Sequence, residues 1–432
     1  MSEAPAVQRP AMLSLDEALT RLLQAVKPLG QTARIGTQDA LGRVLAADIQ
    51  SLLDVPPQDN TSMDGYAVRS ADVLEAGALL RVTQRLPAGV VGAILQPGTA
   101  ARVFTGAQIP PGADAVVMQE QCELVAGGAE PPVGDWGAVR IQATVQAGQW
   151  IRRRGEDVQQ GSTVLKGGTR LDAAALGLAA SVGAAQVTVA RRPRVALFST
   201  GDELVMPSDP PQPLKPGAIY NSNRFTLRGL LQGLGCEVID LGCVPDRLDA
   251  TRAALREAAQ HADLILTSGG VSVGEEDHVR PAVQAEGRLD LWQIAIKPGK
   301  PLAFGNVRRA TATAAEGDGS AWFMGLPGNP VASFVTFLLL VRPVILQLQG
   351  ASRLAPRGLE LRADFDWPRA DKRREFLRVR VNDAGGLDLF PNQSSGVLSS
   401  AVWADGLVDN PPGQIIARGD RVRFLPLSEL LS

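Results

Sequence analysis

Between residues 14 and 27, apolar and polar positions alternate with the period of an amphipathic helix. Ser14 followed three residues later by Glu17 is a capping box, in which each side chain bonds the other residue's backbone N–H. The pattern predicts a helix that begins just after Ser14. Its apolar face consists of Leu15, Ala18, Leu19, Leu22, Leu23 and Val26.

From about residue 40 to residue 190 the pattern changes to short runs of β character. Gly- and Pro-containing turns separate these runs, as is typical of strands joined by tight connections. The texture predicts a β-rich N-terminal half that can comprise two small units. The runs include ARVFTGA, ADAVVMQ, GAVRIQATV and STVLKGG.

Strand-like and helix-like segments alternate from Arg194 onward. RVALFST, EVIDLGCV and DLILTS have strand character, whereas 223–235 and 249–262 have helical periodicity. Such alternation predicts a mostly parallel sheet covered by helices on both faces. Ligands of a sheet of this kind bind beyond the carboxyl ends of the strands, where the loops STGDEL, VPD and SGGVSVGEED fall.

After residue 350 the pattern returns to β character. The runs LELRADFDW, EFLRVRVN, GLDLFP and DRVRFLPL predict a compact C-terminal β unit, and ASRLAPRG (351–358) marks the boundary before it. The longest apolar run, VASFVTFLLLV (331–341), is too short to span a bilayer and predicts a buried helix.

Composition narrows the class of protein. A chain of 432 residues with a net charge of −2 predicts several globular units and gives no electrostatic basis for binding nucleic acid or an anionic membrane. The start, MSEAPAVQRP, has no signal-peptide features and is expected to be a disordered tail. Three cysteines without metal-type spacing favour a reducing cytoplasm. Two histidines disfavour zinc chemistry, whereas 45 acidic residues leave carboxylate–magnesium chemistry open.

The stretch TSGGVSVGEED (267–277) combines a phosphate-type turn with acidic residues. Its Ser and Gly amides can point at an oxyanion as a backbone nest. Glu203 and Asp246 end the neighbouring strands, so they can converge with Asp277. Converging carboxylates repel one another unless a cation lies between them, which favours a hard ion such as magnesium. The alternative is a set of solvated loop acids that bind nothing.

Three further motifs carry candidate polar chemistry. IKPGKP presents Lys297 and Lys300 around a stiff turn suited to an anion, or forms an ordinary basic turn. In GLPGNPVAS, Asn329 and Pro330 are typical of a helix start, and a well-capped helix is the favoured interpretation over an anion site. NTSMDGYAVRSAD, TGAQIPPGADAVV and RRRGEDVQQG are, taken singly, polar turns.

Taken together, seven motifs resemble the molybdopterin molybdenumtransferase family, which includes MoeA and the E domain of gephyrin. MDGYAVRSAD, FTGAQIPPGADAVV, RRRGEDV, FSTGDEL, SGGVSVGEED, AIKPGKP and GLPGNPVAS occur in the family's order, and the resemblance covers about residues 11–428. It implies a homodimer of multidomain α/β plus β chains: a linker domain (11–55 and 141–190), an inserted small β domain (56–140), a three-layer α/β domain (191–350) and a C-terminal β-barrel-like domain (351–432).

The resemblance also implies a reaction and a set of residues. Molybdate is inserted into adenylylated molybdopterin, and the adenylate is cleaved with Mg²⁺ to release AMP. Glu203, Asp246 and Asp277 match the metal-binding and catalytic carboxylates. Asp64, Thr105 and Asp157 match catalytic residues that the family brings in from the partner subunit. The substrate-binding matches are Thr267, Ser268, Gly269, Gly270, Ser272, Lys297, Lys300, Pro301, Arg378 and Ser395.

Two departures and two alternatives accompany this resemblance. His278 stands where the family often has an aromatic residue, and 308–322 is a polar insertion between two expected strands. One alternative function is that of a nucleotide-handling enzyme such as the molybdopterin adenylyltransferase, which is also a candidate partner together with recipient molybdoenzymes. The other is a non-catalytic scaffold of the gephyrin type.

Overall fold

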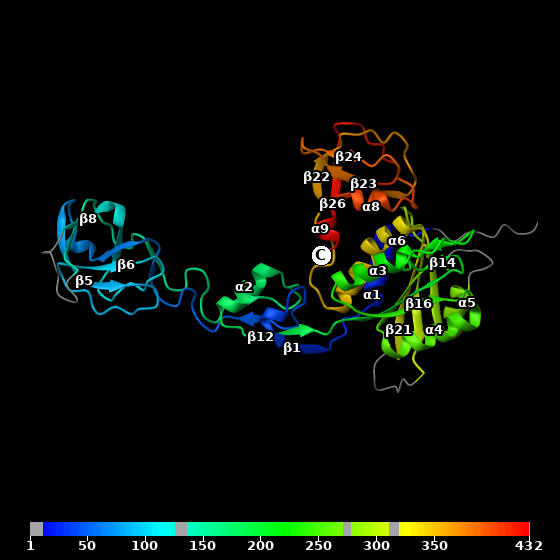
Figure 1. Ribbon diagram of the computed structural model, residues 1–432, viewed down its shortest axis with the longest axis horizontal. Coiled ribbons are helices and arrows are strands. Elements are labelled where there is room, and N and C mark those ends of the chain that lie inside the picture. Colours follow the sequence, from blue (N-terminus) through cyan, green and yellow to red (C-terminus); the bar gives the residue numbers. More distant parts are fainter. Residues whose placement is uncertain (1–11, 126–135, 271–277, 311–318, 432) are drawn as a thin grey trace, which may run out of the picture.

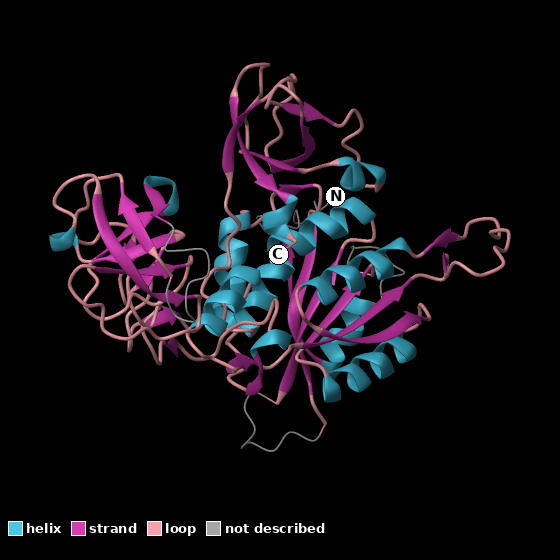
Figure 2. Ribbon diagram, turned by 60° about the vertical axis from the view of Figure 1, so that its left-hand side comes forward, coloured by secondary structure: helices cyan, strands magenta, loops and turns pink. Residues whose placement is uncertain are grey.

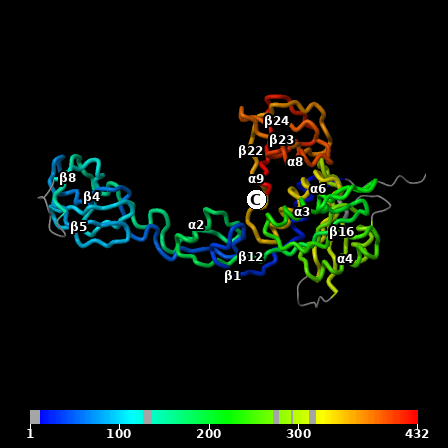
Figure 3. Tube along the Cα trace, in the orientation of Figure 1, coloured from blue at the N-terminus to red at the C-terminus, as the bar shows by residue number. Residues whose placement is uncertain are grey.

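A computed structural model describes residues 12–125, 136–270, 278–310 and 319–431. Figure 1 shows an elongated chain: a β sheet at one end, a narrow middle part, and an α/β unit at the other end with a second β unit above it. The tube in Figure 3 shows that the chain runs out to the far sheet and returns, so that early and late N-terminal segments lie side by side in the middle.

Three short antiparallel strand pairs form the middle part. β1 (Thr32–Gly36) pairs with β12 (Gln186–Ala190), β2 (Ile49–Gln50) with β11 (Thr163–Leu165), and β3 (Asn60–Thr61) with β10 (Ile151–Arg152). Helix α2 (Ala173–Ser181) begins at Asp172, whose side chain accepts the Ala175 N–H. A small core with Leu45, Leu171, Val187 and Val189 holds the two passes of the chain together.

The sheet at the far end has the strand order β7-β4-β6-β5-β9-β8. Alternate residues of its strands enter different cores, because successive side chains of a strand point to opposite faces. Tyr66 and Val68 belong to one core, and Ala67 to the other. The strands are β4 (Gly65–Val68), β5 (Ala78–Leu86), β6 (Thr99–Val103), β7 (Ala115–Met118), β8 (Cys122–Val125) and β9 (Ala138–Ile141).

The α/β unit contains a six-stranded sheet of order β16-β13-β17-β21-β20-β18. The first four strands are parallel, and β20 and β18 pair antiparallel at one edge, so the sheet is mixed. The expected strands over 194–200 and 237–244 are present with those bounds. The strands are β13 (Arg194–Thr200), β16 (Glu237–Val244), β17 (Leu264–Ser268), β18 (Gly287–Gln293), β20 (Pro301–Arg308) and β21 (Ser320–Leu326).

Helices pack on both faces of this sheet, as Figure 2 shows. Val195 and Leu197 point into one core with the buried side of α3, whereas Ala196 and Phe198 point into the other with α4 and α5. The predicted helices 223–235 and 249–262 are confirmed within two residues at each end. Their bounds are α3 (Ser222–Gly233), α4 (Leu248–His261) and α5 (Val279–Glu286).

The apolar run after Asn329 forms one long buried helix. It consists of α6 (Pro330–Thr336), a π-helical turn η4 (Phe337–Val341) and α7 (Arg342–Leu348). Pro343 has no N–H to donate, and the wider turn accommodates that missing bond. The helix is long and apolar enough to cross a membrane, but 89% of its most apolar window is buried inside the molecule. The prediction of a buried core helix is confirmed.

The N-terminal helix packs on the α/β unit, although the family resemblance placed all of 11–55 in the linker domain. α1 (Leu15–Ala25) begins at Ser14 with both capping-box hydrogen bonds to Glu17, as predicted. Its buried residues, however, belong to the core shared with α3 and α7, because its apolar face is covered by the long helix. The part of the chain that leaves the α/β unit therefore starts after this helix.

The C-terminal β unit includes one strand from the α/β unit. Its sheet has the order β19-β23-β25-β26-β22, with β24 paired to β23. β19 (Ile296–Lys297) pairs parallel with β23, so that Lys297 lies opposite Glu375. This pairing ties the two units together beside the functional site. The other elements are β22 (Leu359–Arg362), β23 (Arg374–Val381), β24 (Leu387–Leu389), β25 (Gly406–Asn410), β26 (Arg421–Pro426), α8 (Ser399–Trp403) and α9 (Leu427–Leu430).

Candidate functional site

A cavity of about 930 Å³ lies at the carboxyl edge of the parallel strands. Thr200, Ser268 and Pro327, at or just after the ends of β13, β17 and β21, line it. The location agrees with the prediction that ligands bind beyond these strand ends. The opposite wall comes from the C-terminal β unit and consists of Arg373, Gln393, Ser394, Ser395 and Gly396.

The turn after β17 forms the floor of this cavity. Ser268, Gly269 and Gly270 line it, and both glycines have positive φ, +88° and +65°. A Cβ at Gly270 would lie 2.4 Å from Val279 Cγ2, so glycine is required for the turn to pack against α5. Thr267 is fully buried, and its Oγ1 has no hydrogen-bond partner among the residues that the structure describes. Ser272, also predicted here, lies outside those residues.

Two of the three predicted metal carboxylates are described, and Asp277 lies outside the described residues. Glu203 lines the cavity, whereas Asp246 does not. Asp202 lies beside them and accepts the Asp246 N–H at 3.2 Å. Burial raises the pKa of the Cys243 thiol, and the nearby carboxylates of Glu203, Asp202 and Asp246 raise it further. The loop ends therefore bear a concentrated negative charge.

The described residues do not complete a magnesium site by themselves. Within 12–125, 136–270, 278–310 and 319–431, no three Asp, Glu, His or Cys side chains gather as metal ligands. A magnesium ion takes six oxygen ligands, usually one or two carboxylates with waters and substrate phosphates. Glu203 and Asp246 would therefore supply only part of its ligand set. The predicted role of Asp277 as the third carboxylate stays a prediction.

Lys297, Lys300 and Pro301 line the basic side of the cavity, and their predicted role in substrate binding stays a prediction. Gly299 has a φ of +113°, and a Cβ there would lie 2.3 Å from Thr336 Oγ1, so only glycine lets the turn lie this close to α6. Lys300 is exposed and forms no ion pair with any residue in the described part of the chain. Its ammonium group is available to an anion in the cavity.

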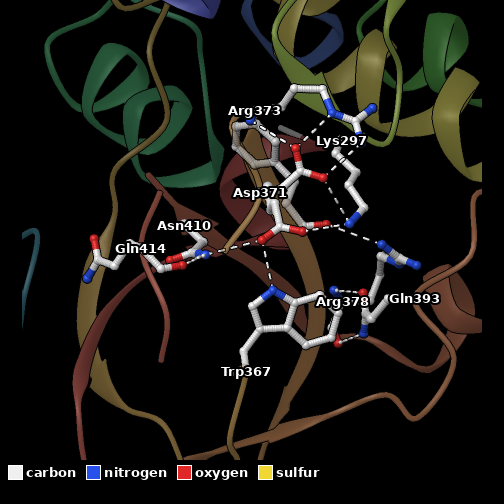
Figure 4. Close-up of polar contacts among 10 residues, drawn as sticks. Lys297, Trp367, Asp371, Arg373, Arg378, Gln393, Asn410 and Gln414 are labelled. Carbon is white, nitrogen blue, oxygen red and sulfur yellow. Dashed lines mark hydrogen bonds and ion pairs between the residues drawn. The ribbon is translucent and has the colours of Figure 1, made fainter. Parts of the chain in front are cut away.

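Lys297, in contrast, is held by two carboxylates of the C-terminal unit (Figure 4). Its Nζ lies 2.9 Å from Glu375 Oε1 and 3.3 Å from Asp371 Oδ2. Burial alone would lower the pKa of Lys297, but its hydrogen bonds and ion pairs with Glu375 and Asp371 outweigh burial and raise that pKa. Lys297 is therefore a charged group with partners, not an isolated cation.

Arg378 and Ser395 occupy different positions relative to the cavity. Ser395 lines it, and its carbonyl oxygen accepts the Val331 N–H of α6 at 2.9 Å. Arg378 does not line it: the guanidinium is buried and donates to Ser400 Oγ and to the carbonyls of Phe376 and Ser394. Burial lowers the pKa of Arg378 to about 10. The structure thus places Arg378 behind the loop that carries Ser395.

Arg373 is a cavity residue that the sequence analysis missed. Its guanidinium binds Asp371 in a bidentate pair, with Nε 3.0 Å from Oδ1 and a terminal nitrogen 2.9 Å from Oδ2. The run RREFLR contains several arginines, and their spacing alone does not show which faces the cavity. Other lining residues that carried no signal are Tyr220, Asn221, Ser222, Asn223 and Ser394.

Helix α6 begins at this cavity, and the favoured interpretation of GLPGNPVAS is supported in part. Asn329 is at the N-cap position and Pro330 at the first helical position, although the Asn329 side chain makes no capping hydrogen bond. Asn223 Nδ2 donates to Gly328 O at 2.8 Å and fixes the preceding turn. Asn329 and Pro330 both line the cavity.

Asp64, Thr105 and Asp157 lie outside the cavity in the same chain. The Thr105 N–H and Oγ1 each donate to Asp64 Oδ1 at 2.7 Å, and these hydrogen bonds lower the pKa of Asp64. Asp157 lies on the middle part, where its N–H donates to Val55 O. Figure 1 shows the sheet that follows Asp64 far from the α/β unit. Within one chain these residues are not brought to the cavity.

The fold and cavity define a multidomain protein of α/β and β units in which the C-terminal β unit forms one wall of the cleft beyond the parallel strands. Family models match consecutive parts: the MoeA N-terminal region (domains I and II) at 13–183, a probable molybdopterin binding domain at 196–347, and the MoeA C-terminal region (domain IV) at 360–427. Molybdopterin molybdenumtransferase of Haemophilus influenzae is 39% identical over 428 residues, covering 97% of this chain and 100% of that protein.

Two further comparisons agree with these matches. Molybdopterin molybdenumtransferase of a Nostoc species is 36% identical over 400 residues, covering 90% of this chain and 87% of that protein. The crystal structure of a molybdopterin biosynthesis MoeA protein from Pyrococcus horikoshii superimposes with a TM-score of 0.79 at 28% identity, covering 96% of this chain and 100% of that one. The chain belongs to the molybdopterin molybdenumtransferase family.

Proposed function

We propose that this chain inserts molybdate into adenylylated molybdopterin, cleaving the adenylate and releasing AMP and molybdenum cofactor. Its family membership makes it an enzyme of molybdenum cofactor biosynthesis. The observation that carries the proposal is a single cavity that joins the turn after β17, the lysine turn and a wall of Arg373 and serines from the C-terminal unit. Such a cavity has room for a nucleotide-bearing substrate and cations for an oxyanion.

The residues of this cavity divide the work by charge. Lys300 and Arg373 supply donors that suit a tetrahedral dianion, since charge-assisted hydrogen bonds are the stronger class. The turn at Ser268, Gly269 and Gly270 lets phosphate oxygens approach the backbone, because neither glycine has a side chain in the way. Binding both substrates in one cavity brings their reacting atoms together, which is the main source of rate in such reactions.

We propose magnesium as the ion that Glu203, Asp246 and Asp277 hold during the reaction. The support is the negative charge concentrated at these loop ends, which raises the Cys243 pKa. A bound divalent ion would neutralise part of that charge and supply electrostatic stabilisation to the phosphates. The residues themselves would position the ion beside the turn after β17.

We also propose a homodimer in which Asp64, Thr105 and Asp157 of one subunit complete the cavity of the other. None of the three lines the cavity of its own chain, which supports this arrangement. The domain limits 11–55 with 141–190, 56–140, 191–350 and 351–432 belong to the same proposal, except that α1 packs on the α/β unit, together with a three-layer central domain and a barrel-like C-terminal domain. A cytoplasmic location, and partnership with the molybdopterin adenylyltransferase and with recipient molybdoenzymes, complete it.

One experiment tests the reaction directly. Purified protein is mixed with adenylylated molybdopterin, molybdate and magnesium, and AMP is measured by chromatography. We expect AMP to be released in proportion to the molybdenum cofactor formed, and only when molybdate is present. Cleavage that proceeds equally well without molybdate, or no cleavage at all, would refute the proposed reaction. The family matches at both ends of the chain disfavour a lone adenylyltransferase domain.

A further inference from the structure

Arg373 and Lys297, two of the cations that line the cavity, share one carboxylate. Asp371 accepts two side-chain hydrogen bonds from Arg373, at 3.0 and 2.9 Å, and its Oδ2 also lies 3.3 Å from Lys297 Nζ. Asp371 thus carries the kind of negative charge that an oxyanion carries. It accepts from the same arginine and ammonium donors that would bind an oxyanion at this position.

A second carboxylate makes Asp371 unnecessary for neutralising Lys297. Glu375 is almost fully buried, lies 2.9 Å from Lys297 Nζ, and its other oxygen accepts from Trp367 Nε1 at 2.8 Å. Glu375 therefore bridges Lys297 and Trp367, both of which are labelled in Figure 4. Asp371 is more exposed, with 20% of its side chain accessible, and it precedes β23 in a loop. Asp371 is therefore the more easily displaced of the two partners.

We propose that Asp371 competes with the oxyanion for Arg373 and Lys297 and thereby sets the affinity of the cavity for a tetrahedral dianion. The inference rests on the proposed function only in placing that oxyanion in this cavity. On the basic side of the cavity, Lys297, Lys300 and Arg373 are offset by Asp371 and Glu375, which leaves one excess positive charge there, and Glu203 is a further carboxylate that lines the cavity. A fixed negative charge a few ångströms from a dianion opposes its binding, and the opposition is strong where solvent screening is incomplete.

The test is isothermal titration of the full-length protein with sodium molybdate, without nucleotide. Asp371→Asn keeps an acceptor for the Arg373 backbone N–H and removes the competing charge. We expect this variant to bind molybdate about tenfold more tightly than the wild type, the ratio that corresponds to about 1.4 kcal/mol. If Asp371 instead serves to position Arg373, the same variant will bind molybdate more weakly. Weaker or unchanged binding overturns the proposal.

Asp364→Asn is the matched control. Asp364 forms the same kind of bidentate pair with an arginine two residues away, Arg362, in the same C-terminal unit, but Arg362, unlike Arg373, does not line the cavity. We expect this variant to keep the wild-type affinity. Asp371→Glu restores the charge and should return molybdate affinity to within about threefold of the wild type. If Asp371→Asn fails to fold, Asp371→Ser provides the same loss of charge and is judged by the same sign.

Failure of this inference is distinguishable from failure of the proposed function. Molybdate binding is measured at equilibrium without adenylylated molybdopterin, whereas the proposed function is judged by AMP release. If the wild type releases AMP in the presence of molybdate but Asp371→Asn binds molybdate more weakly, the proposed function stands and the role proposed for Asp371 is wrong. Proteins that bind no molybdate at all, wild type and variants alike, contradict an oxyanion site between these residues.

Discussion

Gln393 and Arg378 hydrogen-bond to each other in both directions. The Arg378 N–H donates to Gln393 Oε1 at 2.9 Å, and Gln393 Nε2 donates back to the Arg378 carbonyl at 3.0 Å. The guanidinium of Arg378 also donates to Ser394 O. Arg378 therefore holds the loop that carries Ser394 and Ser395 and does not itself line the cavity, so we expect it to act as a positioning residue.

Removing the Gln393 amide is expected to loosen this loop. Gln393→Ala leaves the Arg378 N–H without its acceptor inside the protein, which costs about 1–3 kcal/mol of stability. We expect a lower melting temperature of the C-terminal unit and a higher molybdate concentration at half-maximal rate, with nucleotide affinity unchanged. Gln414→Ala serves as the control, because Asn410 Nδ2 donates to the backbone carbonyl of Gln414, which the substitution keeps. Equal weakening of nucleotide and molybdate would contradict a local role for Gln393.

Lys300 is expected to contribute to oxyanion binding more than any lysine outside the cavity. Because its ammonium group forms no ion pair within the described residues, Lys300→Ala removes a donor to the anion without breaking a network. We expect the molybdate concentration at half-maximal rate to rise about tenfold or more, since a charge-assisted contact contributes about 1.5–3 kcal/mol. Lys372→Ala is the matched control, because Lys372 is exposed beside Arg373 but does not line the cavity. Similar effects of the two changes would remove Lys300 from the site.

The turn after β17 is expected to tolerate no side chain at Gly270. A Cβ there would lie 2.4 Å from Val279 Cγ2 and 2.9 Å from Thr200 Oγ1, and the residue has a φ of +65°. Gly270→Ala should displace the turn and lower the rate of AMP release by at least about tenfold, with a stability loss of about 1–3 kcal/mol. Gly328→Ala, a cavity glycine whose added Cβ would meet nothing closer than 3.8 Å, should change the rate little. Wild-type turnover in Gly270→Ala would show that the turn can shift without consequence.

The Cys243 thiol provides a readout of the acidic loop ends that does not depend on turnover. Burial and the carboxylates of Glu203, Asp202 and Asp246 raise its pKa, so a smaller fraction of it is thiolate at a given pH than in an unperturbed cysteine. Glu203→Gln removes one of those charges and should lower the pKa and speed alkylation by iodoacetamide. Magnesium bound beside these carboxylates should act in the same direction. The rate of alkylation at Cys243 is measured by peptide mass spectrometry with and without magnesium. A rate that magnesium does not change would argue against the ion at this position.

Local structure was predictable where a short sequence pattern is compatible with only one kind of element. The capping box at Ser14 and Glu17 forms both of its hydrogen bonds, and the alternation after Arg194 gives the strands and helices expected of it. Side-chain periodicity follows directly from which face of an element is buried, so short windows carry this information. The position of the cavity followed too, because parallel strands place their carboxyl ends at one edge.

Contacts between distant segments were not predictable in the same way. The pairing of β19 with β23 puts Lys297 opposite Glu375, 78 residues later, and nothing near either residue signals it. Arg373 and Arg378 are five positions apart in one basic run, yet one lines the cavity and the other is buried behind it. Only the placement of the whole sheet against the α/β unit decides which arginine lines the cavity.

A shared active site predicts that two inactive variants restore each other. In the proposed dimer, Asp64 of one subunit and Glu203 of the other belong to the same cavity. Asp64→Asn and Glu203→Gln should each abolish AMP release alone. A heterodimer of the two collects both changes in one cavity and leaves the other cavity unaltered, so up to half of the wild-type activity per dimer should return.

The control pairs two changes from the same side of the proposed interface. Asp64→Asn with Thr105→Ala puts one damaged residue into each cavity, since both residues lie on the N-terminal side and share a hydrogen bond. This heterodimer should stay inactive under the shared-site arrangement. Differently tagged subunits, co-expressed and purified through both tags, allow AMP release to be measured on each heterodimer. Heterodimers of Asp64→Asn with Glu203→Gln that pair and fold yet remain inactive would leave the Asp64–Thr105 pair as a structural feature of its own turn, because each cavity would then be built within one chain.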